Sequence, residues 1–250
     1  VLNGTLIDTV IADTGGQFTV SGSYMTGGDV ITLFLDDGTA TGASVILSSG
    51  SYMTGVSLRA NRLIIRSESG SYAVTSQHLD TADNHSDRGI SQVFNVAGNS
   101  MHTQSGFALL IWTGTTLISS GGTFAIGSGV IIDGSFAMGT GTVTVSGSWI
   151  ASSTQGSFSG SNLVIFDGSG TTVTITSNNG SISGVTLQGT GSTWQLSDAL
   201  DINGMFTLQN GTFNQGSQSL NIAGDLRIAA GTTFNKSTND SILTLDGDLR

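Results

Sequence analysis

Apolar and polar residues alternate with a period of two along much of the chain, and the clearest alternation returns at intervals in its last fifth. Residues 200–208 read LDINGMFTL, residues 220–228 read LNIAGDLRI and residues 243–249 read LTLDGDL. The copies start 20 and 23 residues apart. A short alternating unit that recurs at this period is typical of a solenoid.

Each copy predicts two short strands with one buried face, because successive side chains point to opposite faces of a strand. We attribute the central glycine to a corner, where the backbone bends or a Cβ would clash. Phe213 and Phe234 each follow a Gly-Thr segment, and we expect them to stack from coil to coil. Looser copies of the unit, and remnants that keep only the glycine and the aromatic residue, occur at residues 18–24, 50–52, 70–72, 122–124, 130–138 and 143–151.

These features predict an all-β fold, a parallel β-helix (β-solenoid) with about 20–23 residues per coil, as one continuous segment over residues 1–250. About 11 or 12 coils would form a rod of roughly 55 Å at the inter-strand spacing of about 4.8 Å. Asn203-Gly204 and Asp246-Gly247 also suit hairpin turns, so an antiparallel barrel or sandwich remains the alternative. Because the last motif stops at Arg250 without a cap, we expect a longer chain or pairing with another subunit there.

One polar segment, at about residues 76–91, breaks the pattern and is predicted to be an irregular loop that projects from the rod. Imidazoles and carboxylates would suit a transition ion, and carboxylates by themselves would suit calcium or another divalent ion. The spacing matches no known metal motif, so a solvated loop or a loop that contacts a partner is the competing interpretation. The candidate metal ligands in this loop are His78, Asp80, Asp83, His85 and Asp87.

Composition excludes several classes of protein. Only 10% of residues are charged, but 37% are hydrophobic and alternate, which argues against disorder. The net charge of −10 argues against a nucleic-acid partner. The basic group Arg59, Arg62 and Arg66 is predicted to lie at a solvated strand edge or to form ion pairs.

The chain is not expected to enter a membrane, since its longest apolar run, Phe107–Trp112, has the length of a strand. It begins at Val1 without a signal peptide, so we expect a secretion signal and an anchor in flanking sequence. A surface of Ser, Thr and Gly with a single lysine, Lys236, favours an extracellular or cell-surface location.

Residues 211–226 contain GTFN followed by LNIAGDL, and residues 231–249 contain GTTFN followed by LTLDGDL. These two stretches resemble the repeats of bacterial extracellular β-helix proteins. Such repeats occur in autotransporter passengers, filamentous-haemagglutinin-like adhesins and giant surface proteins. The resemblance covers residues 118–250 well and residues 1–75 more weakly. It implies a right-handed helix, secretion, and an adhesive or structural role.

Parallel β-helices also include polysaccharide lyases and glycosidases, which gather carboxylates on one face. Here the acidic residues adjoin glycines at expected corners, where Asp favours turns; they include Asp36, Asp37, Asp167, Asp225 and Asp248. We therefore expect no enzyme and no cofactor, but a structural or adhesive rod that self-associates into fibres or contacts glycans and cell surfaces. A carbohydrate-binding or polysaccharide-degrading β-helix is the alternative.

Overall fold

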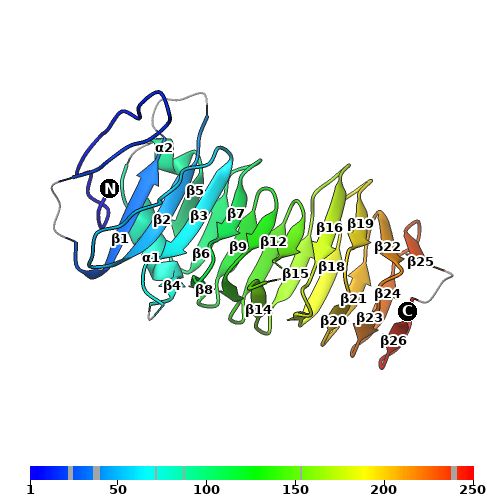
Figure 1. Cartoon of the computed structure of the whole chain (residues 1–250). Helices are drawn as coiled ribbons and strands as arrows, with labels where there is room; N and C mark the ends of the chain where they lie inside the picture. Colours follow the sequence, from blue (N-terminus) through cyan, green and yellow to red (C-terminus); the bar gives the residue numbers. More distant parts are fainter. Residues whose placement is uncertain (22–24, 36–39, 71, 87, 153, 238–240) are drawn as a thin grey trace.

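The chain forms a parallel β-solenoid of about 9 turns with about 21 residues per turn, as seen in a computed structural model of the whole chain (Figure 1). Each regular turn contributes one strand to each of three faces. The fold class and the repeat length predicted from the sequence are therefore confirmed. The structure describes residues 1–21, 25–35, 40–70, 72–86, 88–152, 154–237 and 241–250.

The first face is one long sheet that runs the length of the rod. All neighbouring strands in it are parallel except β1 and β2, which pair antiparallel. In spatial order its strands are β1 (Gly27–Phe34), β2 (Ala43–Ser49), β3 (Arg62–Ser67), β7 (Ala108–Ile111), β10 (Val130–Ile132), β13 (Trp149–Ala151), β16 (Thr172–Thr176), β19 (Thr193–Leu196), β22 (Thr212–Gly216) and β25 (Thr233–Lys236).

The second face is a sheet that is also parallel, except for the antiparallel pair β5 and β6 at its N-terminal end. In spatial order from that end its strands are β5 (Phe94–Ala97), β6 (Ser100–Thr103), β9 (Thr123–Ile126), β12 (Thr142–Val145), β15 (Leu163–Phe166), β18 (Gly184–Leu187), β21 (Phe206–Leu208) and β24 (Leu226–Ile228).

The third face consists of two short parallel sheets placed one after the other along the rod. The first contains β4 (Val74–Thr75), β8 (Thr116–Ile118), β11 (Ser135–Ala137) and β14 (Ser157–Ser159). The second contains β17 (Ser181–Ile182), β20 (Leu200–Ile202), β23 (Leu220–Ile222) and β26 (Leu243–Leu245). Two short helices, α1 (Ser76–Asp83) and α2 (Arg88–Ser91), lie near the N-terminal end (Figure 1).

The repeated sequence unit builds a corner between two faces. In residues 200–208 the first apolar pair lies in β20 on the third face and the second pair in β21 on the second face. In residues 130–138 the same pattern joins β10 on the long sheet to β11 on the third face. In residues 143–151 it joins β12 on the second face to β13 on the long sheet. The unit thus marks any corner, which is why its copies do not all recur at the period of a turn.

The core consists of columns of inward side chains in register between turns. Trp194, Phe213 and Phe234 are successive partners in the long sheet, and the rings of Phe213 and Phe234 have centroids 5.1 Å apart. The predicted stacking of these two residues is confirmed. The parallel registers rule out the antiparallel barrel or sandwich.

The prediction of 11 or 12 coils was too high. Residues 1–26 and 50–61, where the looser copies at 18–24 and 50–52 lie, contain no strand in the part that the structure describes. Residues 76–83 form a helix, so the polar segment is not the irregular loop that we expected. Fewer residues therefore remain for regular turns, and about 9 turns correspond to a rod of roughly 40 Å.

The corner glycines are required because backbones of successive turns approach closely. A Cβ on Gly224 would lie 2.6 Å from the carbonyl carbon of Gly204, and one on Gly247 would lie 2.5 Å from the oxygen of Gly224. These distances are shorter than a carbon atom can tolerate. The sequence suggested that these glycines either allow a bend or avoid a clash. Their φ angles are not positive, so they are needed because a Cβ would clash with the neighbouring turn.

We predict that Gly224→Ala lowers the free energy of unfolding by about 1–3 kcal/mol, because the new methyl group pushes two turns apart. Gly70→Ala is the control: a Cβ there meets no atom within 4 Å, and its effect should stay within about 0.5 kcal/mol. Chemical denaturation followed by circular dichroism measures both. Equal stability of the two variants would contradict the proposed close contact.

Candidate functional site: a pocket over the outer face of the long sheet

Four outward-facing residues at the N-terminal end of the long sheet are buried although they do not face the core of the solenoid. Ile31 and Ile46 are cross-strand partners, as are Ile64 and Leu110, and none is more than 5% exposed. Outward apolar side chains in a solenoid normally contact water. A second layer of chain must therefore cover this part of the sheet.

The segment at residues 51–60 supplies part of that layer. The Ser44 hydroxyl donates to the Ser57 carbonyl at 2.7 Å. The guanidinium of Arg66 donates to the carbonyls of Gly55 and Thr54 at 2.7 and 3.1 Å, and it pairs with Glu68. The ion pair predicted for the basic group is thus present at Arg66, and the two hydrogen bonds from this residue to carbonyls fasten the covering segment to β3.

Arg59 and Arg66 both lie over the ring of Trp112, at 5.6 and 5.9 Å from its centroid. Cations at these distances are attracted to the negative face of an indole. Arg66 therefore holds the cover through two of its carbonyls, and Arg59 of the cover contacts the ring of Trp112.

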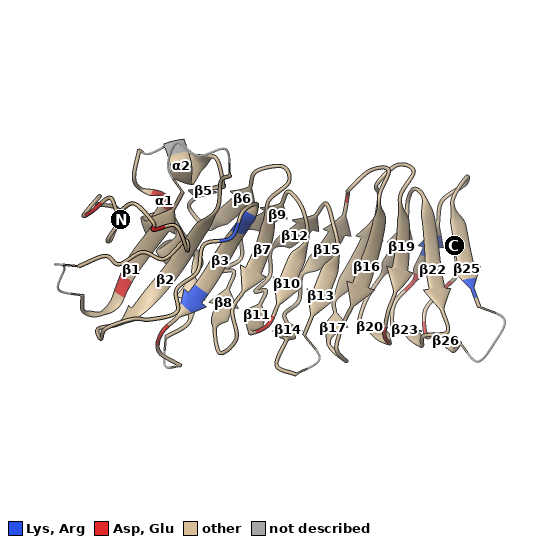
Figure 2. Cartoon of the chain, turned by 45° about the horizontal axis from the view of Figure 1, so that its top comes forward, with Lys and Arg blue, Asp and Glu red and all other residues tan. Residues whose placement is uncertain are grey.

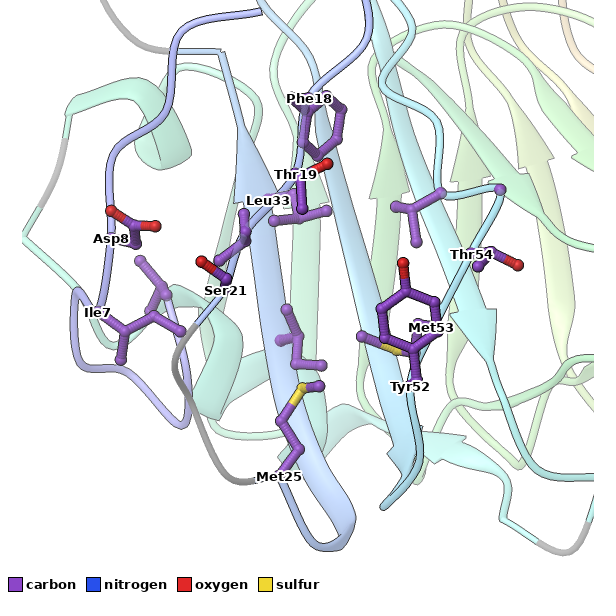
Figure 3. Close-up of a pocket in the computed structure, with 15 residues that line it drawn as sticks. Ile7, Asp8, Phe18, Thr19, Ser21, Met25, Leu33, Tyr52, Met53 and Thr54 are labelled. Atoms are coloured by element: carbon purple, nitrogen blue, oxygen red, sulfur yellow. The ribbon is translucent and has the colours of Figure 1, made fainter.

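Residues 7–21 and 52–56 leave a pocket of about 540 Å³ between themselves and the outer face of β1 (Figure 3). Figure 3 shows Leu33 projecting from β1, with Ile7 on one side of it and Tyr52 and Met53 on the other. The lining residues are Val1, Ile7, Asp8, Phe18, Thr19, Val20, Ser21, Met25, Ile31, Leu33, Tyr52, Met53, Thr54, Gly55 and Val56.

Met25 and Met53 occupy the same position in two copies of the heptapeptide SGSYMTG, at residues 21–27 and 49–55. The antiparallel pairing of β1 with β2 brings Gly27 opposite Ser49, so the two copies meet at one end of these strands. Both methionines line the pocket. Methionine adapts its shape to irregular apolar ligands.

The chemistry of the lining favours an uncharged apolar ligand or an apolar side chain of a partner. The volume lies within the range of about 300–1,000 Å³ that is usual for ligand pockets. Asp8 has the one charged side chain among the described lining residues, and its Oδ1 accepts a hydrogen bond from the backbone N–H of Thr9. This mainly apolar lining is suited to binding.

We predict that the pocket takes up N-phenyl-1-naphthylamine, a neutral apolar probe, in a saturable titration followed by probe fluorescence. Leu33→Trp fills the space and should weaken uptake by about tenfold or more. Ile150→Trp is the control, because Ile150 is an outward apolar residue of the same sheet that lies outside the pocket. Equal uptake by the two variants would place the probe elsewhere.

The N-terminal end of the solenoid is closed by α1. Leu79 and Ala82 on this helix are fully buried and join the core. The hydroxyl of Thr32 in β1 donates to the Ala82 carbonyl at 3.1 Å, and the Asp83 carboxylate accepts from the N–H of Val96 in β5 at 2.8 Å. The polar segment therefore caps the rod, which the sequence did not predict.

The edge of β1 is closed as well. Asn3 donates its backbone N–H to the Val30 carbonyl and accepts the Val30 N–H with its side chain, both at 2.8 Å. The N–H of Thr32 donates to the carbonyl of Val1 at 2.9 Å. Residues 1–3 thus occupy the backbone groups that another strand would need.

The candidate metal ligands of this segment have different surroundings. His78 contacts the N-terminus of its own helix, Asp83 binds β5, Asp80 is exposed and His85 is half-buried, whereas Asp87 lies outside the described residues. Among the residues that the structure describes, no three His, Cys, Asp or Glu side chains are grouped so as to hold a metal ion. Binding of calcium or another divalent ion by this segment stays a prediction, and the described residues form no cluster of ligands for it.

His78 completes the helix cap. The backbone N–H of Thr75 donates to its Nδ1 at 3.1 Å, while the Thr75 hydroxyl accepts the His78 N–H at 3.4 Å. Burial lowers the pKa of His78 below its usual 6.5. Burial also raises the pKa of Asp83, in opposition to the hydrogen bond from Val96. Both shifts result mainly from the enclosure of the cap against the solenoid.

We predict that the protein loses stability as the pH falls below 6.5, because the unfolded chain then binds a proton at His78 more readily than the folded one. Protonation also removes the acceptor of the Thr75 N–H. The His78→Gln variant keeps a side-chain acceptor for the capping box but has no group that titrates at this position. The stability of the variant should therefore depend less on pH in this range. Thermal unfolding from neutral to mildly acidic pH compares the two; identical profiles would contradict the role of His78.

The acidic residues considered for catalysis take structural roles where the structure describes them. Asp167 accepts from the Ser146 hydroxyl at 2.8 Å. Asp225 and Asp248 both pair with Arg250, at 3.2 and 3.0 Å, and Asp225 also accepts the Asp248 N–H. Asp36 and Asp37 lie outside the described residues.

Sequence reasoning missed both the cap and the pocket. The signal for the helix was the spacing of Ser76, Leu79 and Ala82, three residues apart, which are its buried positions. For the pocket the periodic signal was misleading: residues 18–24 and 50–52 resemble the repeated unit, but residues 7–21 and 52–56 contain no strand in the described part. The hints were the apolar residues of these segments, such as Ile7 and Phe18, and the repeated heptapeptide that carries Met25 and Met53.

Comparison of the chain with protein-family models, curated proteins and solved structures gave no match. Within the described residues, no helix has the length and apolar character needed to cross a membrane.

Proposed function

We propose that the chain is an extracellular structural or adhesive β-solenoid, a stiff surface segment without catalytic activity. The observation that carries this proposal is the continuous core, in which inward columns extend from the helical cap to the last described turn. Such a core gives stiffness to every turn, since each turn hydrogen-bonds to its neighbours.

Polar side chains at the corners strengthen the contacts between turns. The amide of Asn178 donates to the carbonyls of Ser152 and Gly156 one turn earlier, at 2.7 and 2.8 Å. Asn210 donates to the Gln188 carbonyl at 2.8 Å. These bonds stabilise the stacking of turns, as expected for a stiff rod.

The closed N-terminal end bears on how such rods would associate. Because residues 1–3 and α1 occupy β1 and the core opening, strand pairing with another copy is unfavourable at that end. Contact through the sides of the rod, with glycans, cell surfaces or neighbouring rods, is the mode of association that we favour. A polysaccharide-degrading enzyme would instead need two carboxylates free to face one groove.

The proposal predicts that antibodies against the chain label intact, unpermeabilised cells of its source organism, and that external protease removes the signal. Incubation of the purified chain with a panel of polysaccharides should release no reducing sugar. A cytosolic marker that stays unlabelled is the control. Labelling only after permeabilisation, or the release of reducing sugar, would overturn the proposal.

A further inference from the structure

The C-terminal half of the long sheet presents two columns of uncharged polar side chains on its outer face. The first column is Thr172, Thr193, Thr212 and Thr233, which are partners in the registers of β16, β19, β22 and β25. The second column, two residues further along each strand, is Thr174, Gln195, Asn214 and Asn235. We call these eight residues the polar array.

The array is held in place from beneath. Val173, Trp194 and Phe213 lie between its columns and point inward, each at most 1% exposed. Threonine side chains in strands have few rotamers, so little freedom is lost when a ligand binds. Neighbouring groups are about 4.8 Å apart across strands and about 6.7 Å apart along a strand. The array is therefore a preorganised lattice of donors and acceptors.

The hydrogen-bonding groups of the array are mostly unused. Within the described part of the chain, its one internal side-chain bond runs from the Asn235 amide to the Asn214 oxygen, at 2.8 Å. The hydroxyls of the first column have no protein partner there, although all four residues are exposed or half-buried. At the corners, in contrast, the Asn178 and Asn210 amides bond to the preceding turn. The array is therefore free to bind a ligand.

The array also lacks charge in a chain of net charge −10. Figure 2 draws β16, β19 and β22 without charged residues. The one charged residue on the four strands of the array is Lys236, at the end of β25, so a charged polymer would find little counter-charge on them. Protein interfaces favour aromatic residues, Met and Arg at their centres, and the outward positions here have none. A repeating, uncharged ligand rich in hydroxyl groups matches this chemistry.

We propose that the polar array binds a neutral polysaccharide, whose repeated hydroxyls bond to successive turns of the solenoid. This inference rests on the proposed adhesive function and names its ligand and face. Each hydrogen bond is weak because it replaces one to water, so affinity arises from several turns acting together.

The test uses the full chain and measures its depletion from solution by microcrystalline cellulose and by chitin, with anionic alginate beads as the charged comparison. We expect saturable binding to at least one neutral polymer and little to alginate. The double variant Thr193→Val/Thr212→Val removes two adjacent hydroxyls while keeping side-chain shape, and should weaken binding by about tenfold or more.

The matched control is Thr186→Val/Thr207→Val. These two threonines are also register partners on adjacent strands and half-buried, but they lie on the second face. Equal binding by both double variants, or depletion by neither neutral polymer, would overturn the assignment. So would a dimer in sedimentation that the Thr193→Val/Thr212→Val variant loses, since a second copy would then cover the array. None of these results changes the surface labelling that tests the proposed function.

Discussion

Parallel strands pair residue with residue, so each side chain of the solenoid lies against the equivalent side chain of the next turn. Inside, this register aligns Trp194, Phe213 and Phe234 in one column. At the corners it brings backbone against backbone, so that Gly204, Gly224 and Gly247 leave no room for a Cβ. Stacking in register is thus the constraint on which the core, the corners and the outer faces all depend.

The same constraint explains what the sequence revealed. Alternation and corner glycines follow from stacking, so the strand pairs and the contact of Phe213 with Phe234 could be predicted. The pair of faces that a given motif joins could not be predicted, because every corner imposes the same requirements on the chain. Residues 130–138 and 143–151 look alike but turn different corners. Local pattern therefore gives the fold class and not the number of turns.

The cap and the pocket depend on interactions with weaker sequence signals. Helix α1 is short, and its capping box uses His78 where glutamate or glutamine is usual. Its stability comes from Leu79 and Ala82 entering a core that exists only after the turns have stacked. The pocket forms where irregular segments cross strands distant in sequence. Neither the cap nor the pocket follows from a regular repeat of apolar positions, so neither could be predicted from the local sequence pattern.

The long sheet shows how one fold can support different surfaces. Its inward columns are mainly apolar, with Thr32 and Gln215 as buried polar members, but its outward side chains change from Ile31, Ile46 and Leu110 to the threonines and amides of the polar array. The apolar end requires a cover and gains a pocket, whereas the polar end needs none and stays accessible. Because the core fixes the backbone, the outward positions can vary without changing the fold. Binding properties are therefore to be sought on the outer faces.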